Sequence, residues 1–241
     1  MSDERRAELT ERLAAVRARI ADACAAAGRS PDDVALLAVT KTVPASDVTI
    51  LMDLGLTAFG ENRVQEAGAK VDEVAATHPG ARWHLVGGLQ RNKARAAVRW
   101  ADRVESLDSV RLADALDAAV RRAQEAGDRS DALPVLLQFS VDGDPERGGV
   151  APDGLLPLAE HVAGCAGLRL DGLMAVAPLG MDTERAFSSV AAAAGRLRSA
   201  FPQARTLSAG MSGDLDVAIS HGSDVVRVGT ALVGDRRITS R

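Results

Sequence analysis

The sequence predicts a single (β/α)₈ barrel, of the TIM-barrel type, with an extra N-terminal helix. Short apolar segments typical of buried strands alternate with helical patterns, which favours parallel strands joined by right-handed crossovers. Eight such strand segments occur in 241 residues, and barrels of roughly 250 residues form one domain. No GxGxxG motif follows the first strand, so an open dinucleotide-binding sheet has little support. We therefore expect one α/β domain over residues 1–241.

The first predicted element is an amphipathic helix from Asp3 to Gly28. Its apolar stripe has the period of a helix that packs on its own barrel, which is a commoner use than partner binding. The stripe comprises Leu9, Leu13, Val16, Ile20 and Cys24.

Apolar runs bounded by turn-forming residues mark the strands in order. Strands are predicted at 34–40, 57–61, 82–87, 103–107, 134–141, 169–176, 204–209 and 224–229. The helical patterns between them lie near 45–54, 64–76, 91–100, 109–127, 153–164, 183–200 and 214–221. The glycine-rich segment from Ser140 to Asp153 is interpreted as a loop after the fifth strand and not as a linker between domains.

Composition excludes several classes of protein. The charge is mildly acidic, with 29 basic and 33 acidic residues and no long basic block, so neither nucleic acid nor membrane is an expected partner. The N-terminus lacks the apolar core of a signal peptide, and we expect a cytoplasmic protein. Cys24 and Cys165 have neither a CxxC partner nor a nearby histidine at metal-ligand spacing. We expect two reduced cysteines and no metal site.

Lys41 directly follows the apolar run of the first strand. In a barrel, the chemistry takes place at the carboxyl ends of the strands. A desolvated lysine loses its proton more easily, and the neutral amine condenses with an aldehyde to form a Schiff base. The alternative is a lysine that closes the strand and extends its amine into water.

The segments after the seventh and eighth strands have the composition of a phosphate cradle. Gly210 and Gly213 let the backbone approach an anion, and Ser212 and Gly213 precede a short helix whose dipole favours negative charge. Gly229 and Thr230 provide two more backbone donors. Taken alone, the segment after the seventh strand is explained equally well as a turn followed by a helix N-cap. Its pairing with Gly229 and Thr230 after the eighth strand favours the interpretation as a phosphate site.

Arg227 interrupts the apolar eighth strand, on the same face as Val225 and Gly229. A buried guanidinium keeps its charge and needs a partner. Two interpretations stay open: an ion pair across the barrel, or a contact that keeps a ring nitrogen unprotonated. An imine-forming lysine, a phosphate cradle and an arginine for a ring together predict a pyridoxal 5′-phosphate site.

Over nearly its whole length the sequence resembles the pyridoxal phosphate homeostasis protein (YggS) family, which shares the fold type III barrel of alanine racemase. Five blocks carry the resemblance: LLAVTKTVPASDV at 36–48, FGENRVQEAGAK at 59–70, WHLVGGLQRNK at 83–93, LRLDGLMAVAP at 168–178 and TLSAGMSGDLDVAISHGSDVVRVGTALVG at 206–234. Two loops depart from the family pattern, at Gly87-Gly88 and at Glu146-Arg147-Gly148-Gly149. Neither loop is expected to touch the residues assigned to the cofactor.

The resemblance implies that Lys41 carries the cofactor as a covalent imine and that Asn62 lies near its phenolic oxygen. It implies that Arg227 meets the pyridine nitrogen. The residues implied around the phosphate are Ser208, Met211, Ser212, Gly229 and Thr230. The implied function is to bind, buffer or deliver pyridoxal 5′-phosphate without robust turnover, with B6 vitamers and apo-enzymes as partners. We expect a monomer, with a weak dimer as the alternative.

The main alternative is an amino-acid racemase that uses the same cofactor. Racemisation in this fold type uses a lysine on one face and a tyrosine on the other. The sequence contains no tyrosine, and it stops where a racemase continues into a second β domain. His84 is the replacement base, but a histidine after Trp83 in a buried strand is more often a hydrogen-bonded core residue. A cofactor-free interaction module is the third class. The remaining histidines are expected to be structural: His78, His161 and His221.

Overall fold

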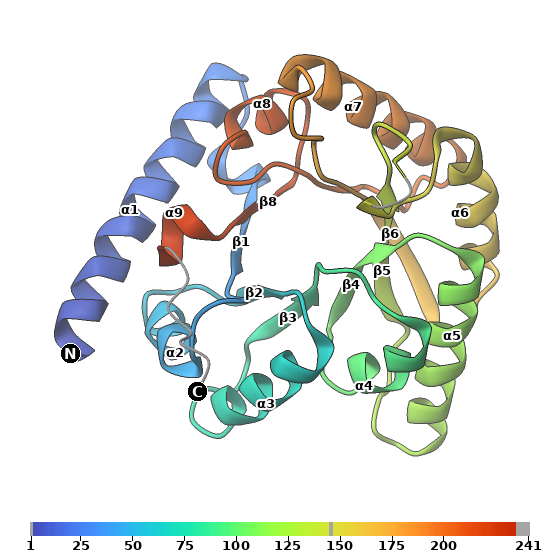
Figure 1. Ribbon diagram of the computed structural model, residues 1–241, viewed down its shortest axis with the longest axis horizontal. Helices are drawn as coiled ribbons and strands as arrows, with labels where there is room; N and C mark the ends of the chain where they lie inside the picture. Colours follow the sequence, from blue (N-terminus) through green and yellow to red (C-terminus); the bar gives the residue numbers. More distant parts are fainter. Residues whose placement is uncertain (1, 145–146, 235–241) are drawn as a thin grey trace.

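A computed structural model describes residues 2–144 and 147–234 of the chain. Its eight strands are parallel, pair in chain order and close into a barrel where β8 meets β1 (Figure 1). The strands are β1 (Ala35–Val39), β2 (Ala58–Glu61), β3 (Arg82–Leu85), β4 (Arg103–Leu107), β5 (Leu133–Phe139), β6 (Leu168–Ala175), β7 (Thr206–Ser208) and β8 (Val225–Val228). Each predicted strand is present, so the predicted (β/α)₈ barrel is confirmed.

Helices surround the barrel and connect successive strands (Figure 1). They are α1 (Ser2–Ala26), α2 (Ala45–Asp53), α3 (Val64–Ala75), α4 (Ala94–Val98), α5 (Val110–Glu125), α6 (Leu155–Ala163), α7 (Thr183–Ala200), α8 (Leu215–Ser220) and α9 (Thr230–Val233). The described residues also form the short 3₁₀ segments η1 (Pro31–Asp33), η2 (Arg91–Lys93) and η4 (Pro152–Gly154). In the described part of the chain, no helix has the length and apolar character needed to cross a membrane.

Two helices differ from the sequence prediction. The helix expected at 91–100 is divided into the 3₁₀ turn η2 and the short helix α4. The four-residue helix α9 was not predicted, because its apolar sequence directly after β8 resembles a continuation of the strand. It begins at Thr230, so it shapes one of the two predicted phosphate loops.

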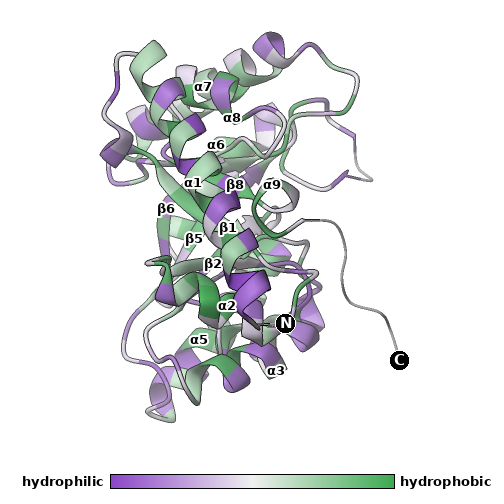
Figure 2. Cartoon of the chain, turned by 90° about the vertical axis from the view of Figure 1, so that its left-hand side faces the viewer, coloured by the Kyte–Doolittle hydropathy of each residue, from purple (hydrophilic) through white to green (hydrophobic). Residues whose placement is uncertain are grey.

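The extra helix α1 lies on the outside of the barrel along α2, α8 and α9 (Figures 1 and 2). Its apolar stripe is buried against these elements, as predicted; the buried residues are Leu9, Leu13, Val16, Ile20 and Cys24. Ion pairs of Arg5 with Asp47 and of Arg19 with Asp216 fasten α1 to α2 and α8. The helix therefore packs on its own barrel.

Strand register decides which side chains face the interior of the barrel. β1 and β8 pair Leu37 with Arg227 and Ala38 with Val228. Side chains alternate between the two faces of a strand, so Leu37 and Arg227 share one face. Ala38 and Val228 belong to the apolar core between strands and helices. Arg227 therefore points into the barrel.

Strand β6 contains a bulge at Gly172, where its register against β5 shifts. Gly172 has a φ of 155°, and a Cβ atom there would lie 1.9 Å from the carbonyl oxygen of Thr206. Only glycine allows β6 and β7 to approach this closely. The bulge thus sets the course of β6 before Ala175, whose carbonyl oxygen faces the site described next.

Candidate functional site

Lys41 lies in the turn between β1 and α2, at the mouth of the barrel. It lines a cavity of about 660 Å³ together with Asn62, the start of α2 and one side of α3. Its side chain is exposed, and no hydrogen bond or ion pair holds its amine within the described ranges. The amine is therefore unengaged and accessible at this mouth, and the desolvation that the sequence suggested for Lys41 is not seen.

The second lysine of this cavity is fully engaged. The amine of Lys70 donates hydrogen bonds of 2.7 Å to the carboxylate of Glu61 and of 2.7 Å to the carbonyl oxygen of Thr40. The Thr40 hydroxyl donates to the same Glu61 oxygen at 2.7 Å. The side chains of Lys70 and Glu61 are 10% and 2% exposed, so the pair is buried and satisfied. This network fixes the backbone immediately before Lys41, and of the two lysines it leaves Lys41 alone available.

The loops after β7 and β8 meet, as the phosphate interpretation requires. The backbone N–H of Ala231 donates to the Ser212 hydroxyl at 3.4 Å. Within residues 2–144 and 147–234, the N–H groups of Ser212, Gly213, Gly229 and Thr230 donate to no protein acceptor. Four unpaired N–H groups on two adjoining loops form a suitable anion site.

Two residues implied around the phosphate are already engaged. The N–H of Met211 donates to Asp214 at 2.6 Å, so it is not among the free donors. The Ser208 hydroxyl donates to Glu105 at 2.6 Å inside the barrel. The contacts of Ser208 are thus with the interior polar network and not with the loops.

The end of β8 brings the phosphate loops close to the first strand. A Cβ atom at Gly229 would lie 3.6 Å from Cβ of Val39, two residues before Lys41. Closure of the barrel through β8 and β1 produces this contact. The free amine and the free N–H groups therefore belong to neighbouring strand ends.

Arg227 anchors a polar network in the barrel interior. One of its Nη atoms donates to the carbonyl and the hydroxyl oxygens of Ser208, at 2.7 and 2.9 Å. The other donates to the carbonyl oxygen of Ala175 at 2.7 Å. Glu105 accepts from the Ser208 hydroxyl and hydrogen bonds to Nδ1 of His84 at 2.7 Å. Five strands, β3, β4, β6, β7 and β8, thus contribute to one cluster around the guanidinium.

The charges in this cluster are balanced. Burial alone would raise the pKa of Glu105, but the hydrogen bond and charge of His84, the charge of Arg227 and the Ser208 hydrogen bond together lower it. Glu105 is therefore a carboxylate that offsets the buried guanidinium. Burial lowers the pKa of Arg227, and Glu105 acts against that shift. His84 is a hydrogen-bonded interior histidine, as the commoner interpretation of the sequence expected.

Asn62 is half-buried after β2 and lines the same cavity as Lys41.

The two loops that differ from the family pattern were expected not to touch the residues assigned to the cofactor. This expectation needs a correction at Gly87. A Cβ atom there would lie 2.3 Å from the backbone oxygen of Asn62, so this glycine packs directly on it. Gly88, where the family pattern actually differs, has nothing within 4 Å of such an atom. The other loop that differs from the family pattern begins at Glu146, and Glu146 lies outside the described residues.

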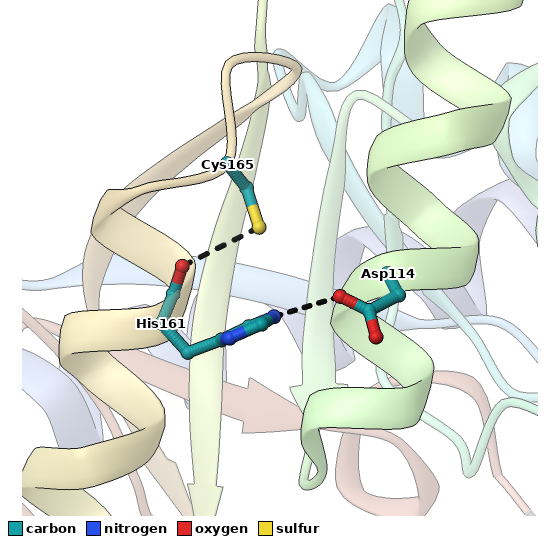
Figure 3. Close-up of side chains that lie close together, drawn as sticks. All are labelled: Asp114, His161 and Cys165. Atoms are coloured by element: carbon teal, nitrogen blue, oxygen red, sulfur yellow. Dashed lines mark hydrogen bonds and ion pairs between the residues drawn. The ribbon is translucent and has the colours of Figure 1, made fainter.

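Both cysteines are free, as expected, but the expectation that neither has a histidine at metal-ligand spacing is wrong for Cys165. His161 precedes it by four residues, and its ring lies beside the thiol and beside Asp114 on the neighbouring helix (Figure 3). The donor atoms of the three side chains lie within 4.8 Å of one another. The turn after α6 continues the helical geometry beyond the last helical residue, and this brings the thiol to the side of the helix that carries His161.

Three residues of the mouth and interior were missed at the level of sequence: Glu61, Lys70 and Glu105. Glu105 gave a usable signal, because a carboxylate within a predicted barrel strand needs a partner where it is buried. Glu61 and Lys70 are nine residues apart, and only the packing of α3 on β2 brings them together.

Comparison with known proteins agrees with this geometry. Residues 12–237 match the family model described as alanine racemase, N-terminal domain. The pyridoxal phosphate homeostasis protein of Mycobacterium bovis is 47% identical, with 98% of this chain and 96% of that protein aligned. The protein of the same name from Escherichia coli (strain K12) is 37% identical, with 95% and 97% aligned.

Solved structures give the same picture. PipY of Synechococcus elongatus PCC7942, in a structure with PLP bound, superimposes with a TM-score of 0.79 at 36% identity, covering 94% of this chain and 100% of that chain. Alanine racemase from Corynebacterium glutamicum has a TM-score of 0.67 at 14% identity, covering 95% of this chain and 62% of that chain. The second likeness concerns the fold alone.

Proposed function

Since the chain belongs to the alanine racemase N-terminal domain family, and within it to the pyridoxal phosphate homeostasis proteins, we propose that it binds pyridoxal 5′-phosphate covalently through Lys41. We propose further that it buffers or delivers this cofactor. The observation that carries the proposal is the free amine of Lys41 at a strand end that adjoins a loop pair with four unpaired N–H groups.

The residues present fit the cofactor at each of its functional groups. Bound cofactor supplies an aldehyde, which forms an imine with an amine and releases one water molecule. Lys41 offers the amine, and Lys70 cannot compete because Glu61 and Thr40 hold it. Ser212, Gly213, Gly229 and Thr230 offer N–H groups to the phosphate.

Arg227 supports the proposal at the ring. Its two Nη atoms are held by Ser208 and Ala175, and its Nε–H has no acceptor in the described part of the chain. This N–H and the second N–H of the Nη atom that binds Ala175 are the donors available to a pyridine nitrogen. An arginine gives up no proton, so it would leave that nitrogen unprotonated and a weak electron sink. Such a site favours holding the cofactor over catalysing with it.

The racemase alternative has less support. The sequence contains no tyrosine to act as a second proton donor. His84, the replacement candidate, is hydrogen bonded to Glu105 in the barrel interior. Incubation of the loaded protein with one enantiomer of alanine or serine, followed by chiral chromatography, separates the two functions. We expect no opposite enantiomer above the level of free cofactor.

The binding proposal is tested by titrating the purified protein with pyridoxal 5′-phosphate and with pyridoxal. We expect a visible absorbance band that borohydride abolishes, and retention on dialysis for the phosphorylated form only. Lys41→Ala should lose the band, and Lys93→Ala is the matched control that should keep it. Equal retention of pyridoxal would contradict the role of the two loops.

The delivery role requires a separate measurement. The loaded protein is mixed with an apo-enzyme that uses the cofactor, and recovered activity is compared with that given by the same concentration of free cofactor. We expect recovery to depend on the loaded protein. Recovery should be faster from Arg227→Lys than from Lys93→Ala, because the first variant loses a contact to the cofactor ring. Failure of any transfer would leave buffering as the function.

A further inference from the structure

A cluster outside the barrel mouth has the composition of a metal site. Asp114 lies on α5, His161 in the last turn of α6, and Cys165 in the turn that follows α6. The two helices pack side by side on the outside of the barrel (Figure 1). Figure 3 shows the His161 ring reaching across to Asp114, with the Cys165 sulfur turned toward the same gap.

Local backbone structure explains why the thiol and the ring share one side. α6 ends at Ala163, but the N–H of Gly164 still donates to His161 at 3.1 Å and the N–H of Cys165 to Val162 at 3.0 Å. Residues four apart in such a helical turn face the same way. Asp114 then approaches from α5, and its carboxylate lies 2.7 Å from Nε2 of His161.

The three donor types suit a borderline-soft divalent ion. Zn²⁺ binds thiolate sulfur, imidazole nitrogen and carboxylate oxygen at about 2.0–2.3 Å, in tetrahedral geometry. The donor atoms already lie within 4.8 Å of one another, so small side-chain movements suffice to place them around one ion. The side chains of Asp114 and His161 are 61% and 36% exposed, which leaves an entry path and room for a water as the fourth ligand.

The surroundings favour a cation. The negative charges of Asp117 and Asp114 both act on the Cys165 thiol, so the gap between the three side chains is surrounded by acidic groups. Asp117 is itself held by the N–H of Gly167 at 2.7 Å and does not compete for the gap. A bound divalent ion would reverse the local charge, and the thiol would become a thiolate by releasing its proton to solvent.

We propose that Asp114, His161 and Cys165 bind Zn²⁺ and so join α5 to α6. The site is separate from the barrel mouth, since none of its residues lines the cavity beside Lys41. A bound ion would stabilise the contact between these two neighbouring helices of the outer layer. The proposal does not depend on the cofactor.

Cobalt provides a direct test, because a cysteine ligand gives Co²⁺ an intense thiolate charge-transfer absorption in the near ultraviolet. We expect titration of the reduced, metal-stripped protein with Co²⁺ to produce this absorption and Zn²⁺ to abolish it. Cys165→Ser should remove the absorption. Cys24→Ser, which changes the other, buried cysteine, should retain it.

The histidine has a matched control as well. His161→Ala should weaken Co²⁺ binding by about tenfold or more, since even outer contacts of a metal site change affinity by that factor. His221 also pairs with a carboxylate, that of Glu184 at 3.5 Å, so His221→Ala should leave Co²⁺ binding unchanged. Equal weakening in both histidine variants would overturn the assignment.

Thermal unfolding gives a second readout. Zn²⁺ should raise the Tm of the parent protein and of Cys24→Ser, and leave that of Asp114→Asn nearly unchanged. Asp114 is exposed, so this variant is expected to fold even where Cys165→Ser does not. No charge-transfer absorption with excess Co²⁺, or the same Tm shift in Asp114→Asn as in the parent, would refute the site.

Discussion

At the scale of single residues, the site depends on which charged groups are engaged and which are free. The chain has three lysines, Lys41, Lys70 and Lys93. Lys70 is buried in an ion pair with Glu61, whereas Lys41 is exposed at the mouth. The charged groups in the barrel interior are engaged as well. Arg227 is buried near the opposite charge of Glu105, and both of its Nη atoms are hydrogen bonded. Of the two lysines that line the cavity at the mouth, only Lys41 is left for chemistry.

Glu105→Gln tests the interior charge balance. The variant removes the carboxylate that offsets the buried Arg227, so we expect the free energy of unfolding at neutral pH to fall by about 3 kcal/mol or more. Urea unfolding of the two proteins measures this difference. The conservative change retains the side-chain volume and one hydrogen-bond acceptor, so loss of packing does not explain the effect.

The same pair of proteins gives a pH dependence. The pKa of Glu105 is lower when folded than its ordinary value of 4.5. A carboxyl group with a lowered pKa stabilises the fold above its unfolded pKa, and this contribution is lost as pH falls through the folded pKa. The difference in unfolding free energy between parent and Glu105→Gln should therefore be constant above about pH 5 and shrink in more acidic solution. A difference that grows on acidification would contradict the direction of the shift.

At the scale of secondary-structure elements, the bulge in β6 is the feature that tolerates least change. Gly172→Ala places a Cβ atom 1.9 Å from the Thr206 carbonyl oxygen at a φ of 155°. We expect a loss of more than about 3 kcal/mol of stability, or failure to fold. Gly195→Ala is the matched control, because this helical glycine in α7 has nothing within 4 Å of the new atom. The control should gain about 0.5–1 kcal/mol, as alanine replaces glycine in a helix.

The connection between the end of β1 and α3 is the second feature at this scale. Lys70→Met leaves Glu61 buried without its cation and releases the Thr40 carbonyl oxygen. We expect a loss of about 3–5 kcal/mol of stability. We also expect a lower yield of borohydride-reduced adduct on Lys41 at limiting cofactor. Lys93→Met, in the turn η2, is the control that should change neither. A normal adduct yield in folded Lys70→Met would show that the hydrogen bonds of Lys70 to Glu61 and Thr40 do not position Lys41.

At the scale of the whole molecule, the sequence predicted the barrel because each strand is an apolar run and each connection has a helical period. The extra helix α1 was predicted for the same reason, and its stripe is buried as expected. The helix α9 was not predicted, since four residues after a strand, three of them apolar, carry no helical period. The prediction of one domain over residues 1–241 stays a prediction.

Contacts between distant residues could not be predicted in the same way. Glu105 and Ser208 are 103 positions apart, and only the register around the closed barrel brings them together. Asp114 and His161 meet because α5 and α6 are neighbours. Lys41, Ser212, Gly229 and Arg227 could be proposed as a group because each follows or ends a strand, and strand ends of a parallel barrel share one mouth.

The central claim is that one lysine of three carries the cofactor. The loaded protein is reduced with borohydride, digested, and its lysine-containing peptides are analysed by mass spectrometry. The account predicts a pyridoxyl phosphate mass on the peptide containing Lys41, none on the peptides containing Lys70 or Lys93, and no adduct at all in Lys41→Ala. An adduct on another lysine in the parent protein, or one that persists undiminished in Lys41→Ala, would contradict it.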